Sequence, residues 1–462
     1  MKHLYIILFI LPLIVFGQGW EQTYPGHMWN FNTVSQTSDG GYITGISSGI
    51  EWESQDLSLL KLDENGNEEW SSNLFITDNI CSYFGIIVEE DMDGGYVGCL
   101  YGSCYSNPTI SPQTIDNLGL IFKTDEYGNV SWTQTTDLNL QFMSQTNDGD
   151  YIFLGSFYNY ETTINSVTVM KISNNGDEVW SQDFEGSLIN YLPGSSLQET
   201  NDGGYFFVME ESTNNDIKFI KLDQMGNVEW ENDFIEFNTM SIWGQIVVDN
   251  SLDGGCVSGG VRYDYDENLS LYYVEMILIK TDENGNQEWM VTNQLEDLYS
   301  LQMGDIQSTI DGGYIIVGQT GSTWDSNIIL IKTDENGNEE WTQMYGNNDG
   351  NWGVSVRETS DGGYVIGGTK EVIHEMEYVM YLIKTDGQGN VTSTIEIPKP
   401  TSKRELVKTT NILGQENITI KNQPMIEIYD DGSTEKKDSF RIGINLKVPS
   451  YSTVTDFAKF LG

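Results

Sequence analysis

The sequence predicts an all-β protein, a seven-bladed β-propeller of four-stranded antiparallel blades, from three landmarks that each recur seven times. A first turn, Asp-Gly-Gly-Tyr-like, opens at Asp39, Asp93, Asp148, Asp202, Asp253, Asp311 and Asp361. A second turn, of the form D-x-x-G-N, opens at Asp63, Asp125, Ser173, Asp223, Asp282, Asp334 and Asp386. The third landmark is a tryptophan: Trp20, Trp70, Trp132, Trp180, Trp230, Trp289 and Trp341. Successive first turns lie 54, 55, 54, 51, 58 and 50 residues apart, a period typical of propeller blades.

Each repeat contains the pattern of four strands. In the last repeats, residues 354–356 alternate before the first turn, 364–369 run back from it, and 378–385 alternate into the second turn. The strand that carries the tryptophan, residues 340–345 in the preceding repeat, is the fourth. Gly-Gly and Asn-Gly pairs in the turns allow the positive φ angles of tight hairpins. No stretch has helical periodicity, so we expect strands throughout.

The chain ends supply a prediction of ring closure. The seventh repeat, residues 360–391, lacks its tryptophan strand, and residues 20–24 (WEQTY) match residues 341–345 (WTQMY). We therefore expect the N-terminal strand to complete the last blade. Such a closure leaves no terminal repeat that needs a cap.

Composition outlines four regions. Residues 1–17 have Lys2 and His3, an apolar run and a small-residue site at Gly17, which is the pattern of a secretory signal. Residues 18–397 are the predicted propeller. Residues 398–437 carry seven Lys and Arg against six Asp and Glu, and residues 438–462 match no pattern and stay unassigned.

The predicted propeller is strongly acidic, with 61 Asp and Glu against 11 Lys and Arg, a net charge of −50. Such a field repels nucleic acid and anionic membrane surfaces, so neither is expected as a partner. After the signal no run approaches the ~20 apolar residues of a membrane span. High acidity favours solubility in a salty or calcium-rich medium, with a cationic partner as the alternative.

Seven of the 11 basic residues lie two positions before the second turn: Lys61, Lys123, Lys171, Lys221, Lys280, Lys332 and Lys384. Residues i and i+2 of a strand share a face, so we expect each lysine beside the aspartate of that turn. Identical chemistry in every repeat indicates a structural pairing rather than substrate binding. The recurring tryptophans are likewise predicted to pack between blades, with an exposed aromatic platform as the alternative.

Metal and disulfide sites have weaker signals. Asp334-Glu-Asn-Gly-Asn begins like an EF-hand loop, but its glycine is at position 4 and Tyr345 occupies position 12, so a hairpin turn is expected and calcium stays the alternative. With only His27 and His374 after the signal, no other metal or cofactor is predicted. If the hairpin turns at Asp93, Cys81 falls opposite residues 104–106, which predicts a disulfide between Cys81 and Cys104. Cys99 and Cys256 are expected to be buried thiols.

Three resemblances follow from these motifs. The Gly-rich strand at 364–368 with its downstream turn and tryptophan resembles kelch-type propellers, and D-x-x-G-N-x-x-W resembles the repeat of quinone-dependent dehydrogenases. The copper-binding histidines of kelch-type oxidases and the adjacent cysteine pair of quinoproteins are missing here. Residues 404–407, 411–416, 422–424 and 428–437 resemble the C-terminal sorting domain of type IX secretion substrates in Bacteroidota. That resemblance implies export, contact with the type IX machinery, and a secreted or cell-surface location.

We expect a secreted or surface-attached binding module for a glycan or a protein. The alternatives are an extracellular enzyme, either a hydrolase or lyase or a quinone-dependent oxidoreductase, and a spacer or adhesin without a single ligand. No catalytic constellation stands out in the sequence. Strand direction puts both turns of every blade on one face, the turn face, and the variable second connections on the other, the loop face. Binding residues concentrate in variable loops, so the predicted contacts are Tyr263, Tyr265, Trp324 and His374, with residues 102–119, 262–273 and 370–378 as the long connections.

Overall fold

The protein consists of β-strands throughout the part of the chain that the computed structural model describes. That part is residues 19–24, 33–48, 56–75, 81–105, 115–117, 119–159, 164–188, 197–211, 217–233, 246–266, 271–294, 300–321, 326–346, 350–372, 377–391, 406–411, 425–429 and 434–437. The predicted all-β class is confirmed. Contacts divide the chain into two compact parts, Met1–Ser393 and Thr394–Gly462.

The first blades are formed by short strands joined by tight turns. Their bounds are β1 (Trp20–Tyr24), β2 (Val34–Gln36), β3 (Tyr42–Ser48), β4 (Asp56–Leu62), β5 (Glu68–Phe75), β6 (Cys81–Glu90), β7 (Tyr96–Tyr105), β8 (Ile115–Asn117), β9 (Gly119–Thr124), β10 (Val130–Thr136), β11 (Asn139–Gln145), β12 (Tyr151–Asn159), β13 (Ile164–Ile172) and β14 (Glu178–Ser187).

The remaining strands of the first part follow the same order. They are β15 (Leu197–Glu199), β16 (Tyr205–Glu211), β17 (Ile217–Leu222), β18 (Val228–Asp233), β19 (Val247–Asn250), β20 (Cys256–Asp266), β21 (Leu271–Thr281), β22 (Gln287–Gln294), β23 (Leu301–Ser308), β24 (Tyr314–Thr320), β25 (Asn327–Thr333), β26 (Glu339–Tyr345), β27 (Asn351–Glu358), β28 (Tyr364–Val372) and β29 (Glu377–Thr385). The second part contains a three-stranded sheet of β30 (Leu406–Asn411), β31 (Met425–Tyr429) and β32 (Thr434–Lys437).

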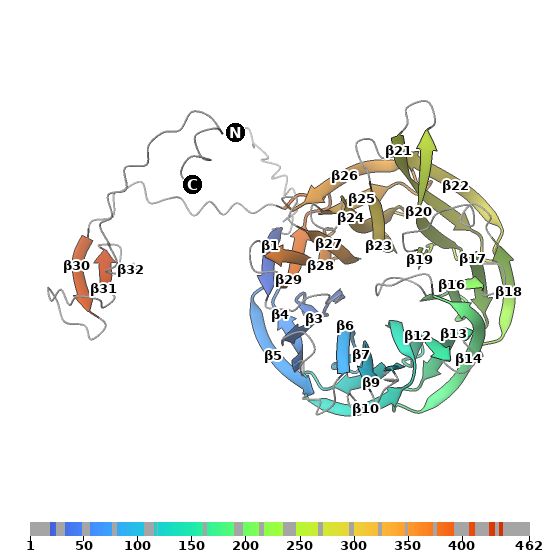
Figure 1. The fold of residues 1–462 in the computed structure, drawn as a ribbon, viewed down its shortest axis with the longest axis horizontal. Coiled ribbons are helices and arrows are strands. Elements are labelled where there is room, and N and C mark those ends of the chain that lie inside the picture. Colours follow the sequence, from blue (N-terminus) through green and yellow to red (C-terminus); the bar gives the residue numbers. More distant parts are fainter. Residues whose placement is uncertain are drawn as a thin grey trace, which may run out of the picture. The chain divides into compact units, whose positions relative to one another are not determined.

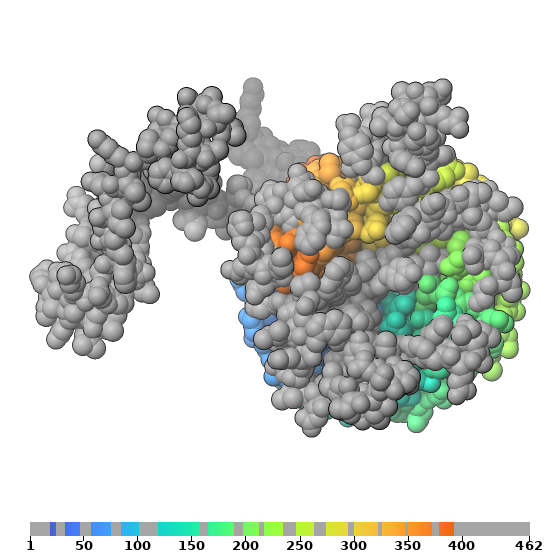
Figure 2. Space-filling view, in the orientation of Figure 1, coloured from blue at the N-terminus to red at the C-terminus, as the bar shows by residue number. Residues whose placement is uncertain are grey.

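Antiparallel pairing groups the strands described in the first part into four-stranded blades. In chain order the blades are β2–β5, then β6, β7, β9 and β10, then β11–β14, β15–β18, β19–β22, β23–β26, and last β27–β29 with β1. The short β8 is added on β7, and β14 also pairs with β16 over two residues. Figure 1 shows the blades arranged around a ring, with β5, β10, β18, β22 and β26 at its rim. Figure 2 shows one face of this ring, where described atoms of the third and fourth blades reach its middle.

Strand β1 is the outer strand of the blade formed by β27–β29. Trp20 pairs with Lys384 in the antiparallel ladder with β29. The side chain of Tyr381 also donates a hydrogen bond to Glu21 Oε2 over 2.7 Å. On the other side, Tyr24 Oη donates to the carbonyl oxygen of Gly66 in the first blade, over 2.5 Å. The first described strand therefore contacts both the last and the first blade.

The hydrophobic core lies between the blades rather than within one central layer. Seven clusters of buried side chains occur among the described residues, and each combines two neighbouring blades, the seventh and first included. The blades approach closely: a Cβ added at Gly45 would lie 2.3 Å from the Cβ of Ile86 in the next blade. The second and third strands of a blade are covered on both faces by the neighbouring blades. Strands in this position, such as β24 and β25, are therefore mostly apolar.

The two turns differ in how they use their glycines. In the first blade, Gly40 has a φ of 88°, which favours glycine, whereas Gly41 is needed for space. A Cβ on Gly41 would lie 2.2 Å from the carbonyl oxygen of Leu62 and 2.6 Å from Lys61 Nζ. The Asp39 carboxylate accepts the N–H of Gly41 over 2.9 Å, which closes the turn.

The repeated tryptophans lie across the seams between blades, as predicted. Trp132, for example, is 6.4 Å from the Tyr151 ring of the next blade and donates its Nε1–H to the carbonyl oxygen of Asn174 in that blade's second turn. Its ring lies against Gly176, where an added Cβ would lie 3.4 Å away. All seven indoles are half-buried. They are therefore seam residues near the rim rather than deep core.

Candidate functional site

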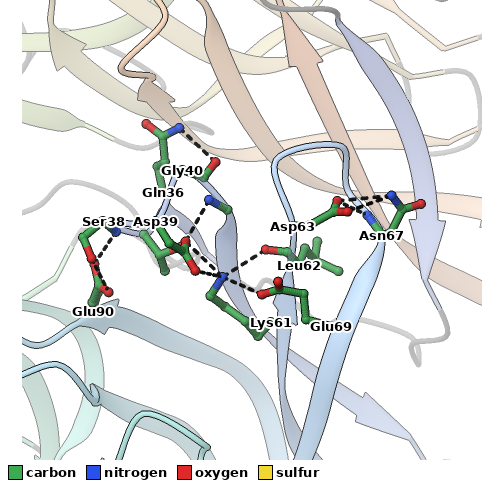
Figure 3. A network of polar contacts seen from close by, with 12 residues as sticks. Gln36, Ser38, Asp39, Gly40, Lys61, Leu62, Asp63, Asn67, Glu69 and Glu90 are labelled. Atoms are coloured by element: carbon green, nitrogen blue, oxygen red, sulfur yellow. Dashed lines mark hydrogen bonds and ion pairs between the residues drawn. The ribbon is translucent and has the colours of Figure 1, made fainter.

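The repeated lysines form ion pairs on the turn face. In the first blade, Lys61 Nζ lies 2.8 Å from Asp39 Oδ2 and 3.0 Å from Glu69 Oε2, and it also donates to the carbonyl oxygen of Leu62 (Figure 3). These contacts confirm a structural pairing. We call the seven equivalent lysines the lysine ring: Lys61, Lys123, Lys171, Lys221, Lys280, Lys332 and Lys384.

The partner expected for Lys61 was wrong, because Lys61 pairs with Asp39 of the first turn and not with Asp63 of the second. Asp63 Oδ1 accepts the backbone N–H groups of Asn65 and Asn67, each over 2.8 Å, and Oδ2 accepts Asn67 Nδ2 over 2.9 Å (Figure 3). The carboxylate of the second turn is therefore occupied by its own loop. Reasoning from one strand face overlooked the aspartate across the hairpin.

The second carboxylate of the lysine ring varies in position but is nearly always present. In four blades it is a glutamate eight residues after the lysine: Glu69, Glu229, Glu288 and Glu340. The second and third blades lack that glutamate, and Asp91 and Asp150 supply the contact to Lys123 and Lys171 instead. In the seventh blade Gly19 stands at the equivalent position. There Lys384 has Asp361 as its one carboxylate partner among the described residues.

Burial and charge make the lysine ring a scaffold. The lysine side chains are 3–11% exposed, whereas their first-turn aspartates are 31–67% exposed. Burial acts to raise the pKa of Asp39, but hydrogen bonds from Lys61 and Thr37 outweigh it and lower that pKa to about 2. Burial likewise acts to raise the pKa of Asp202, but hydrogen bonds from Thr200 and Lys221 outweigh it and lower that pKa to about 2. Each lysine is thus already occupied.

The residues predicted as ligand contacts are only partly within the described chain. Tyr263 and Tyr265 lie in β20, where their backbones pair with Val274 and Tyr272 of β21. Trp324 and His374 lie outside the described residues, so the four contacts stay a prediction.

The expectation of a loop at 262–273 was partly wrong, since β20 and β21 continue as a hairpin as far as the pair Asp266–Leu271. Alternating aromatic residues favour a longer ladder, and the Arg262–Glu275 ion pair joins the two strands. In the second blade, β7 and β8 likewise extend part of the connection at 102–119.

The strand register places the two cysteines of the predicted disulfide opposite each other. Cys81 and Cys104 are direct Cα partners in the pairing of β6 with β7, and the disulfide between them stays a prediction. Cys99 and Cys256 are free and buried, as expected. Burial raises the pKa of both thiols, which keeps them protonated and unreactive.

One position in the repeat differs in chemistry from blade to blade. It is the residue four before the aspartate of the first turn, on the innermost strand, and we call these residues the axial ring: Ser35, Glu89, Ser144, Gln198, Asp249, Gln307 and Arg357. Innermost strands of non-adjacent blades can meet only across the middle of the propeller. Two of these residues, Glu89 and Arg357, come from non-adjacent blades and line one small cavity, in contrast to the uniform lysine ring.

The centre of this group is an ion pair. Arg357 Nη1 lies 2.6 Å from Asp305 Oδ2 and donates to the carbonyl oxygen of Val356 over 2.7 Å. Asp305 comes from the sixth blade and is 1% exposed, while the Arg357 side chain is 24% exposed. Asp305 Oδ2 also accepts the N–H of Val356 over 3.0 Å. Burial works against the charge of Arg357, but Asp305 and Glu89 outweigh it and raise the arginine pKa.

Two further carboxyl groups lie near this pair. Glu89 Oε2 accepts the N–H of Gln145 over 3.2 Å, and Asp249 Oδ2 accepts the N–H of Ser308. Each thereby binds the unpaired edge of the next blade's inner strand. Burial raises the pKa of Glu89, against the opposing effect of Arg357, and burial raises the pKa of Asp249 to about 6.

A small cavity opens among these side chains. We call it the axial cavity; it has a volume of about 10 Å³, room for about one water-sized group. Its walls come from the first, second, third, sixth and seventh blades and include Glu89, Gln141, Phe142, Asp305, Ser355 and Arg357. Gln141 Oε1 is buried and has no hydrogen-bond partner among the described residues. A buried acceptor without a donor is an incentive to bind a donor from outside.

Sequence reasoning missed the axial cavity because it looked for residues that recur. Glu89, Asp249 and Arg357 each look ordinary in their own strand, within a chain that has 69 acidic residues. An alignment of the seven repeats on the first turn would have isolated them, since only unlike groups at one repeat position can make a single site.

Two other classes of site were sought along the described chain. In those ranges no group of three or more His, Cys, Asp or Glu side chains is arranged to hold a metal ion. Nor does any helix there have the length and apolar character needed to cross a membrane.

Comparisons with known proteins extend to solved structures alone. No protein-family model matches the chain, and no curated protein matches it. The polysaccharide lyase Uly1 is similar at 8% identity, with 78% of this chain and 91% of that chain covered and a TM-score of 0.48. The BP39L lectin from Burkholderia pseudomallei is similar at 8% identity over 79% and 98% of the chains, with a TM-score of 0.45. A protein of unknown function from Dyadobacter fermentans is similar at 8% identity, with 79% of this chain and 98% of that chain covered and a TM-score of 0.44. A functional assignment therefore rests on the residues of this chain.

Proposed function

We propose that the protein is an extracellular binding module that recognises a glycan at the middle of the propeller. The observation that carries this proposal is the axial cavity, which is lined by carboxyl-, guanidinium- and amide-bearing residues of different blades. One hydroxyl or amino group of a sugar fits a polar cavity of this size, while the sugar ring stays outside. A cavity with few convergent polar groups on a rigid scaffold suits binding of that kind.

The charge of the surface supports a neutral or cationic partner. All 11 Lys and Arg side chains of residues 18–397 are described, and ten of them pair with carboxylates. The remaining one, Lys370, lies 5.1 Å from the centre of the Tyr381 ring. Because ten of the 11 basic side chains are already paired with acids, the surface favours a glycan without phosphate or sulfate groups.

The loop face is proposed to complete the site. The connections at 102–119, 262–273 and 370–378, with Tyr263, Tyr265, Trp324 and His374, would contact the parts of a ligand that extend beyond the cavity. A protein partner would use the same face. Export fits this function: residues 1–17 as signal, residues 398–437 as a type IX sorting region, and a secreted or cell-surface location are part of the proposal.

An enzyme that cleaves glycans is the second candidate, and one observation favours it. Burial raises the pKa of Asp249 to about 6, which brings this carboxyl group into the range in which an acid or base catalyst works. Cleavage of a bound oligosaccharide, followed by chromatography of the products, separates this candidate from simple binding.

Arrays of glycans and proteins probed with the purified full chain, with and without calcium, test the proposal. We expect binding to one class of glycan that is independent of calcium. A blank glycan array alongside a protein hit would contradict the proposal. Binding that requires calcium would instead assign the recognition to metal ions held by the turns.

A further inference from the structure

The axial cavity has an excess of negative charge. Two carboxyl groups, Glu89 and Asp305, line the cavity beside a single guanidinium, that of Arg357, whereas Asp249 of the axial ring is not part of its walls. Asp305 binds Arg357 directly, so this pair is close to neutral as a unit. When ionised, Glu89 therefore leaves about one negative charge without a cation in the cavity.

Two acceptor atoms in this cavity are still available to a ligand. Both hydrogen bonds that Glu89 receives from described residues end at Oε2, which leaves Oε1 for another donor. Gln141 Oε1 is buried without a partner among those residues. Arg357 uses Nη1 for both Asp305 and the carbonyl oxygen of Val356. The free oxygens of Glu89 and Gln141 favour a ligand group that donates hydrogen bonds.

The volume of the axial cavity limits which hydrogen-bond donor can enter it. With a volume of about 10 Å³, the cavity has room for one water-sized group and none for a sugar ring. An ammonium group has that size and donates three hydrogen bonds, and its positive charge balances the negative charge of the carboxylates. A bare metal ion fits less well, because Arg357 would lie beside it.

We propose that the axial cavity binds the primary ammonium group of an amino sugar, so that the glycan recognised by this propeller carries unacetylated amines. The inference rests on the proposed glycan-binding function and narrows it to one ligand class. The ammonium group enters the cavity and contacts Glu89 and Gln141. The sugar ring stays outside the cavity.

The test compares two oligosaccharides of the same length, a glucosamine oligomer and its fully N-acetylated form. Each is titrated into the full chain by calorimetry at physiological ionic strength. We expect the amine form to bind at least about tenfold more tightly, the value of one charge-assisted hydrogen bond pair. E89Q should weaken the amine form about tenfold, D249N should weaken it less because Asp249 is not in the cavity wall, and both should leave the N-acetylated form unchanged.

The control is D63N, which removes one negative charge from the turn face and leaves the axial cavity intact. Its affinity for the amine form should stay within about twofold of the wild type, because exposed charges at this distance are screened. Thermal unfolding checks that all variants are folded. Equal binding of the two oligosaccharides, or an unchanged amine affinity in E89Q and D249N, would overturn the inference. If another class of glycan binds instead, the proposed function stands while this inference fails; if none binds, both fail.

Discussion

The lysine ring and the axial ring are built from the same repeat but place their charges in opposite ways. In the lysine ring the cation is buried and the acid exposed: Lys221 is 4% exposed and its partner Asp202 60%. Where Arg357 of the axial ring meets Asp305, the acid is buried instead, since Asp305 is 1% exposed and Arg357 24%. The first arrangement recurs in every blade and the second occurs once. Repetition of a residue around the propeller thus indicates scaffold, whereas divergence at one repeat position indicates a site.

Both rings depend on the closed circle of blades, so opening the circle should have the largest effect. Deletion of residues 18–24 removes the β1 ladder and the Trp20 ring, and we expect a loss of about 4 kcal/mol or more in unfolding free energy. Urea unfolding of the deleted protein and of the intact chain measures it. Equal midpoints would contradict the role given to β1.

Removal of the central cation should cost more than removal of a ring lysine. R357M leaves the buried Asp305 carboxylate without a counter-ion, with an expected loss of about 3 kcal/mol at pH 7. K221M, the matched change in the lysine ring, leaves carboxylates that water reaches, so about 1 kcal/mol is expected. Similar losses in both variants, measured by urea unfolding, would erase the distinction between the rings.

The seventh blade offers a comparison within the lysine ring. D361N deprives Lys384 of its one described carboxylate partner, and we expect a loss of about 2 kcal/mol. D202N leaves Glu229 to pair with Lys221, so the loss should be nearer about 1 kcal/mol. Thermal unfolding of the two variants decides the order. A larger loss in D202N would show that the second carboxylate contributes nothing.

A stabilising change is expected at the axial ring. The folded-state pKa of Asp249 is raised to about 6, above its unfolded value, so ionisation of this group disfavours the folded state. Its contribution to stability is full below about pH 4 and is lost as the pH rises through about 6. D249N should therefore be more stable than wild type by about 1–2 kcal/mol at pH 7.5 and gain nothing at pH 4, after allowance for solvent at this half-buried group. Destabilisation at pH 7.5 would contradict the argument.

The sequence predicted what recurs and missed what does not. Sequence reasoning could recognise features that recur along the chain. These are the turns at Asp39 and Asp63, the seam tryptophans, and the match of β1 to the tryptophan strands. The partner of Lys61 was assigned wrongly, since the strand period relates neighbours on one strand and says nothing of Asp39 across the hairpin. The axial cavity was missed because Glu89, Gln141 and Arg357 are far apart in sequence and meet only through ring geometry.

The most direct test of the central claim compares two variants with the same change in charge. E89Q/D249N removes two negative charges from the axial ring, and D63N/D125N removes two from the second turns on the turn face. Affinity for the glycan found on the array is then measured by calorimetry for both variants and the wild type. The account predicts at least about a tenfold loss for the axial variant and a change within about twofold for the turn-face variant. Equal losses in the two, or none in the axial variant, would contradict it.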